Sequence, residues 1–145
     1  MSLVILPDSH PTLRLISEPV TEFNEELGEL ALEMGKTMVE ARGIGLAAPQ
    51  VGKSIRLIVV RLSYGYRVMV NPEFIRKLNR TVNMMEGCLS IRRALWRPID
   101  RPAKCEVKWQ NLEGDWFQEN FSGLDARAVQ HEIDHLDGIL MTDLP

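Results

Sequence analysis

The pentapeptide His131-Glu132-Ile133-Asp134-His135 is the most informative stretch of this 145-residue sequence. It has the form H-E-x-x-H and lies in a segment, Leu124 to Leu136, whose apolar residues recur at helical spacing. Histidines four apart project from one side of an α-helix, so both imidazoles can reach a single metal ion. Glu132 lies beside that face, where a carboxylate can move protons without acting as a ligand. The stretch predicts a metal-binding catalytic helix; the alternative is a pair of ordinary surface histidines.

A catalytic metal site needs a third protein ligand, and it leaves a fourth position for water. Only seven residues follow Gly138, and they contain neither histidine nor glutamate. The third ligand is therefore expected upstream, where Cys88 in the segment Glu86-Gly87-Cys88-Leu89-Ser90 is the best candidate. A thiolate binds borderline divalent metals strongly, whereas many free cysteines are simply small buried apolar residues. We adopt that second interpretation for Cys105, which lies in an ordinary predicted strand.

The remaining periodicity predicts one more helix and several antiparallel strands. Runs of β-branched residues indicate strands, and apolar residues at spacings of three and four indicate a helix that Gly43 would end. The predicted elements are a helix from Asn24 to about Ala41, a strand at 55–61 paired with 66–70, and a hairpin of 104–109 with 115–121 around Glu113-Gly114. The predicted fold class is therefore α+β.

Composition indicates one globular domain comprising residues 1–145. Hydrophobic residues make up 45% of the chain and charged residues 26%, a balance typical of soluble proteins. A net charge of −3 argues against a general nucleic-acid-binding protein, although Arg92, Arg93, Arg97 and Arg101 leave a local basic patch open. The sequence has neither a signal peptide nor an apolar run long enough to cross a bilayer, so we expect a cytoplasmic protein.

The segment Gly43-Ile44-Gly45-Leu46-Ala47-Ala48-Pro49-Gln50 directly follows the first predicted helix. It lacks the G-x-G-x-x-G spacing and ends a helix instead of opening one, so it is not a phosphate-binding loop. Two glycines among small residues suit a backbone that lies close to an extended peptide ligand. On this loop alone, a helix cap followed by a plain turn is the better interpretation.

Together, these three segments resemble the peptide deformylase family, which is marked by G-x-G-L-A-A-x-Q, E-G-C-L-S and H-E-x-D-H in that order. All three motifs are complete, and the resemblance extends from about Leu13 to Leu140. It implies an α+β fold with antiparallel sheets around a central H-E-x-x-H helix. It also implies a metal-dependent hydrolase that removes the N-formyl group from formylmethionyl peptides and nascent proteins, releasing formate.

The resemblance also implies roles for the motif residues. The metal would be held, with water as a fourth ligand, by Cys88, His131 and His135. Family members typically use Fe(II) and accept nickel, cobalt or zinc. Glu132 would act as general base and then as acid to the leaving amine, while Gln50 and the backbone N–H of Leu89 would stabilise the oxyanion.

Substrate binding is implied for four further residues. The backbone at Ile44 and Gly45, with Gly87 opposite, would pair with the peptide as an added strand. The methionine side chain would enter an apolar pocket to which Ile44 and Leu124 contribute. The basic stretch that follows Ser90, with Trp96 inserted, could shape substrate preference, but we interpret it as a solvated loop.

Many bacterial members of the family continue into a C-terminal helix, which in some contacts the ribosome. This chain ends at Pro145, so we expect transient ribosome contact at most, without that helix, and no membrane or specific nucleic-acid partner. Short forms of the family resemble those encoded by some bacteriophages. The sequence therefore leaves open that the protein is encoded by a phage and acts in a bacterial host.

Two other functions compete with this interpretation. A zincin-like protease would cleave internal bonds of unformylated peptides. A non-enzymatic module that binds nascent N-termini would be expected to have lost Glu132, Gln50 or a ligand, and none is lost.

Overall fold

The computed structural model describes residues 3–145. Its helices are α1 (Glu25–Glu40) and α2 (Gly123–Leu136), with short 3-10 turns at Pro11–Arg14, Ala48–Val51, Arg93–Leu95 and Met141–Asp143. Its strands are β1 (Gly45–Ala47), β2 (Leu57–Leu62), β3 (Gly65–Lys77), β4 (Thr81–Glu86), β5 (Arg97–Pro102), β6 (Lys104–Gln110) and β7 (Trp116–Ser122). No helix within residues 3–145 is both long enough and apolar enough to cross a membrane.

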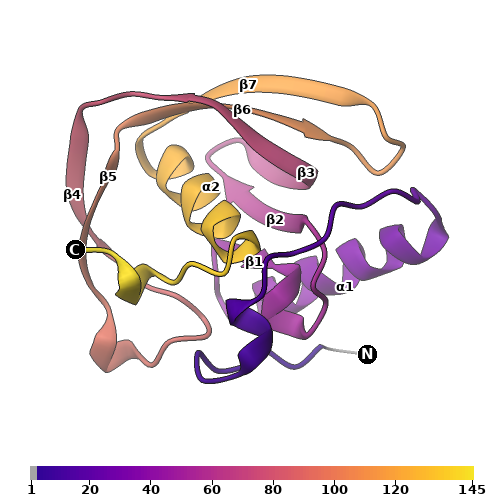
Figure 1. The fold of residues 1–145 in the computed structure, drawn as a ribbon, viewed down its shortest axis with the longest axis horizontal. Helices are drawn as coiled ribbons and strands as arrows, with labels where there is room; N and C mark the ends of the chain where they lie inside the picture. The colour runs from indigo at the N-terminus through magenta and orange to yellow at the C-terminus, as the bar shows by residue number, and fades with distance from the viewer. Residues whose placement is uncertain (1–2) are drawn as a thin grey trace.

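Among residues 3–145, the paired strands are all antiparallel and form two sheets. Five strands pair in the order β1-β2-β3-β6-β7, and β4 pairs with β5 in a separate two-stranded sheet. Figure 1 shows α2 in the middle of the molecule, with strands of both sheets around it. The α+β prediction is therefore confirmed.

Helix α1 has the boundaries that the sequence predicts, apart from its last turn. The Asn24 side chain caps the start by accepting a hydrogen bond from the Leu27 N–H (3.0 Å), and an apolar stripe faces β2. At the other end, the predicted stop at Gly43 is wrong by one residue. Arg42, not Gly43, adopts the left-handed conformation (φ 60°) that usually closes a helix.

The predicted strands are present, and two features were missed. The β2–β3 and β6–β7 hairpins match the predictions at 55–70 and 104–121. The β4–β5 sheet was missed for two reasons. Strand β4 is exposed along nearly its whole length, so its sequence shows no alternation of apolar and polar residues. Strand β5 contains Pro98 and Pro102, and proline is uncommon within strands. Strand β1 was missed because it has only three residues, all of them buried.

Helix α2 is buried on almost every side, which positions the functional site. Ala126, Val129, Ile133 and Leu136 pack against the five-stranded sheet, where each large apolar side chain contributes roughly 1.5–3 kcal/mol. Cys105 belongs to this same core, and burial raises the pKa of its thiol to about 11, as expected of a structural cysteine. The other face of α2 carries buried polar residues, and these require partners.

Candidate metal centre and active site

Three donor atoms converge where α2 meets the loop after β4. The Cys88 sulfur lies 3.4 Å from the Nε2 atom of His135, and the ligand atoms of Cys88, His131 and His135 all lie within 4.8 Å of one another. Tetrahedral bonds of about 2.0–2.3 Å place neighbouring donors roughly 3.3–3.8 Å apart. One sulfur and two nitrogens at these separations fit a single divalent metal ion.

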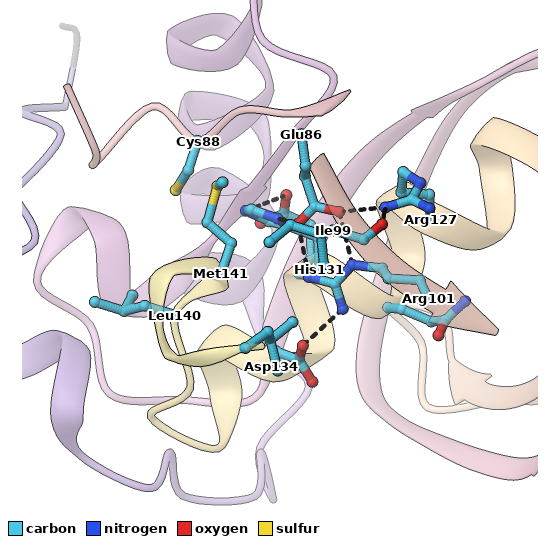
Figure 2. A network of polar contacts seen from close by, with 12 residues as sticks. Glu86, Cys88, Ile99, Arg101, Arg127, His131, Asp134, Leu140 and Met141 are labelled. Carbon is cyan, nitrogen blue, oxygen red and sulfur yellow. Dashed lines mark hydrogen bonds and ion pairs between the residues drawn. The ribbon is translucent and has the colours of Figure 1, made fainter. Parts of the chain in front are cut away.

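A buried carboxylate determines which nitrogen of His131 faces this centre. The Oε2 atom of Glu86 lies 2.6 Å from Nδ1 of His131, so Nδ1 is the protonated nitrogen and Nε2 is free to act as a ligand. Glu86 also receives hydrogen bonds at 2.7 and 2.6 Å from Arg101 and at 3.0 Å from Arg127, and Arg101 continues to Asp134 at 2.8 Å. Figure 2 shows this network extending from His131 to both arginines.

Sequence reasoning missed most of this network. Glu86 was quoted as part of a motif without a role, and Arg101 was grouped with a basic patch. The patch does not form, because Arg101 is buried against Glu86 and Arg97 donates to backbone carbonyls of the C-terminal segment, including that of Thr142 (3.1 Å). Arg127 could have been found, since it lies one helical turn before His131 on the same face of α2.

The predicted site residues are brought together around one cavity of about 260 Å³. Nine of the ten line it: Ile44, Gly45, Gln50, Gly87, Cys88, Leu89, Leu124, His131 and Glu132. The tenth, His135, is buried behind Cys88. Ile44 and Leu124 are more than half exposed, so they lie at the open side of the cavity.

Gly45 lies directly against Glu132. A Cβ atom on Gly45 would be only 2.4 Å from the Oε2 atom of Glu132, so only glycine lets the two approach this closely. Gly45 is also the first residue of β1, which is an edge strand of the sheet. One edge of β1 pairs with β2, and the other edge is unpaired. The plain-turn interpretation of this segment is therefore wrong, because it supplies an open strand edge beside the buried carboxylate.

Two hydrogen-bond donors lie beside Cys88. The Gln50 side chain is held in place, since its Oε1 atom accepts from the Ala47 N–H (2.9 Å) and its Nε2 atom donates to Ser90 Oγ (3.0 Å). The same Nε2 atom lies 3.8 Å from the Cys88 sulfur. Within residues 3–145, the backbone N–H of Leu89 donates to no protein acceptor. Both groups can thus donate hydrogen bonds to an oxygen atom that lies beside Cys88.

Burial tunes the ionisable groups of the site. Burial raises the pKa of Glu132 to about 7, against the opposing effect of His131, which suits a group that accepts and returns a proton near neutrality. Within residues 3–145, its Oε1 atom is buried without a hydrogen-bond partner. Burial lowers the pKa of His135 well below its usual value, which favours the neutral form of the imidazole that metal binding requires.

The chain is similar to known proteins over nearly its whole length. A family model described as polypeptide deformylase matches residues 2–144. A peptide deformylase of Acidobacterium capsulatum is 48% identical over 143 residues, which cover 95% of this chain and 82% of the relative. The crystal structure of peptide deformylase from Thermotoga maritima superposes with a TM-score of 0.97 at 38% identity, covering 99% of this chain and 97% of that one. A Synechococcus elongatus peptide deformylase in complex with actinonin gives a TM-score of 0.91 at 37% identity, covering 96% and 76%. The chain belongs to the polypeptide deformylase family.

Proposed function

We propose that Cys88, His131 and His135 hold one divalent metal ion, and that Glu132 moves the protons of hydrolysis. As a peptide deformylase, the chain removes the N-formyl group from formylmethionyl peptides and nascent proteins. The observation that carries the proposed roles is that the three donor atoms lie within 4.8 Å of one another in a cavity that Glu132 also lines.

The donor set suits a soft or borderline divalent metal, and we propose Fe(II) as the working ion, with nickel, cobalt or zinc able to substitute. An ion held there supplies Lewis-acid chemistry, lowering the pKa of a water molecule towards neutrality. Glu86 orients the His131 ring for this purpose, and its own charge is balanced by Arg101 and Arg127.

The remaining steps use the chain's own side chains. The partner-free Oε1 atom of Glu132 accepts a proton from water as the water oxygen bonds to the formyl carbon. Gln50 Nε2 and the Leu89 N–H donate hydrogen bonds to the oxygen of that carbon as it becomes negative. The carbon–nitrogen bond then breaks, Glu132 delivers its proton to the leaving amine, and formate is released.

The cleft also accounts for substrate binding. We propose that the peptide pairs as an added strand with the open edge at Ile44 and Gly45, with Gly87 opposite. Its methionine side chain would fill the cavity between Ile44 and Leu124. We further infer that residues 1–145 act as one catalytic domain in the cytoplasm, where nascent chains are made, and that any ribosome contact is transient.

A formate-release assay tests the proposed function. The metal-loaded chain should release formate from a formyl-methionyl peptide and leave an acetylated peptide of the same sequence intact. Cleavage of internal bonds in the acetylated peptide would indicate an endoprotease instead. Tight binding of the formylated peptide without formate release would indicate a non-enzymatic binding module.

The identity of the ion has its own test. If the working ion is Fe(II) beside the Cys88 thiolate, activity in air should decay through oxidation of the iron or the sulfur. Nickel-loaded protein should keep its activity under the same conditions. Residual formate release would be followed over time for both forms, in air and under nitrogen, and equal lifetimes in air would contradict iron as the labile component.

A further inference from the structure

Arg42 lies at the outer end of the catalytic cleft. It is exposed, it lines the same cavity as the proposed catalytic residues, and it forms no ion pair with any carboxylate within residues 3–145. Its guanidinium group therefore offers an unneutralised positive charge beside the path of a bound peptide.

The backbone conformation at Arg42 indicates that the arginine side chain has a function. Arg42 closes α1 with a φ of 60°, a conformation that glycine adopts freely and that other residues adopt at a cost. Glycine is the usual residue at this point of a helix. The structure thus retains an arginine where glycine would suit the backbone better, at the rim of a functional site.

The register of the cleft indicates which part of a substrate Arg42 would meet. Gly45 contacts Glu132, so the formyl end of the peptide lies there, and Arg42 is three residues farther out. A peptide paired with β1 advances about 3.3 Å per residue, past Ile44 towards Arg42, which lines the same cavity. Its side chains alternate, so the first and third residues face the same side. With methionine in the cavity, the third residue lies beside Arg42.

A second arginine, Arg93, lies against Trp96, which lines the cavity. The Trp96 ring lies so close over Gly87 that a Cβ there would be 2.6 Å from it, and its Nε1 donates to the Ile91 carbonyl (2.9 Å). The Arg93 guanidinium lies 4.9 Å from the centre of this ring. Interpreting the whole stretch as a solvated loop is therefore wrong for Trp96, which lines the cavity.

We propose that Arg42, with Arg93 against the ring of the cavity-lining Trp96, makes the enzyme select formylated peptides with an acidic third residue, counting formylmethionine as the first. This inference rests on the proposed function. The net charge of −3 would by itself disfavour acidic peptides, so the selection is a local property of the two arginines.

The test uses the metal-loaded chain and formyl-Met-Ala-Xaa-Ser peptides in which Xaa is Glu, Gln or Lys. The kcat/KM ratio of Glu over Lys should be about three to ten at low ionic strength, because an exposed attraction replaces an exposed repulsion of similar size, and it should shrink in high salt. Arg42→Glu should reverse the order. Arg42→Gly should remove most of the preference without lowering Tm, because glycine accepts the backbone conformation.

Arg92→Glu is the matched control, since Arg92 is an exposed arginine that does not line the cavity, and its Glu/Lys ratio should match that of the wild type. Equal rates for the three peptides, or a preference that survives Arg42→Gly, would overturn the inference while formate release still supports the proposed function. A charge effect confined to peptides varied at the second residue would overturn the placement of Arg42. Release of no formate from any peptide would overturn the proposed function itself.

Discussion

Replacing Glu132 with Gln is expected to lower kcat for formate release by at least ~10²–10⁴-fold while leaving the metal content of the protein unchanged. The amide keeps the shape of the side chain and its place against Gly45, but it cannot take up a proton. The Glu132 carboxylate is proposed to move protons and lies outside the Cys88, His131 and His135 donor set. Catalysis and metal binding should therefore separate in this variant.

The matched variant is His135→Ala, which removes one of the three donor atoms. It should reduce the metal content itself, and activity should fall with it. Both variants would be measured for metal by elemental analysis and for formate release from one formyl-methionyl peptide. If Glu132→Gln lost as much metal as His135→Ala, Glu132 would be a ligand or a structural support. Nearly full activity in Glu132→Gln would mean that another group moves the proton.

The features of this protein that depend on residues close together in the sequence could be predicted. The spacing of His131 and His135 placed both imidazoles on one helix face, and the turn at Glu113-Gly114 identified the β6–β7 hairpin. Cys88 was predicted as the third ligand because no histidine or glutamate follows Gly138, and its sulfur lies 3.4 Å from the Nε2 atom of His135. These predictions were possible because each depends on residues near in sequence or on a short inventory of reactive side chains. The hairpin is confirmed, and the ligand roles of the three clustered residues stay predictions.

The parts that depend on long-range contacts were missed. Glu86 pairs with Arg101 and Arg127, which are 15 and 41 residues away, and no periodicity links them. Arginines also occur far more often on surfaces than in cores, so Arg101 was grouped with a basic surface patch that the sequence left open. The left-handed backbone of Arg42 was missed because a local pattern misled the prediction. The neighbouring Gly43 is the residue type that helix ends usually favour.

Glu86→Gln is expected to destabilise the metal-free protein by about 3–5 kcal/mol, because it leaves the buried Arg127 without a counter-charge and Arg101 with only the partly exposed Asp134. Glu86, Arg101 and Arg127 are all less than a tenth exposed, so water cannot replace the lost carboxylate. For a chain of this size, the loss corresponds to a fall in Tm of roughly 10–20 °C. The Asp134→Asn variant is the control. Asp134 is partly exposed and binds Arg101 alone, so its loss should cost about 1 kcal/mol or less.

The pH dependence of the same variant tests whether the charge of Glu86 causes the effect. Burial alone would raise the pKa of Glu86, but hydrogen bonds from Arg101 and His131 outweigh it and hold the pKa well below the ordinary value of 4.5. A carboxylate with a lowered folded-state pKa stabilises the fold fully above its unfolded-state pKa, and this contribution is lost as the pH falls through the folded-state value. The contribution of the Glu86 carboxylate to the stability gap between wild type and Glu86→Gln should therefore be complete above about pH 5 and shrink below it. Denaturant unfolding of both metal-free proteins from about pH 7 to about pH 3 measures the gap. A gap that stayed the same across this range would mean that Glu86 acts by shape and hydrogen bonding, and that its charge does not hold the arginines around the metal centre.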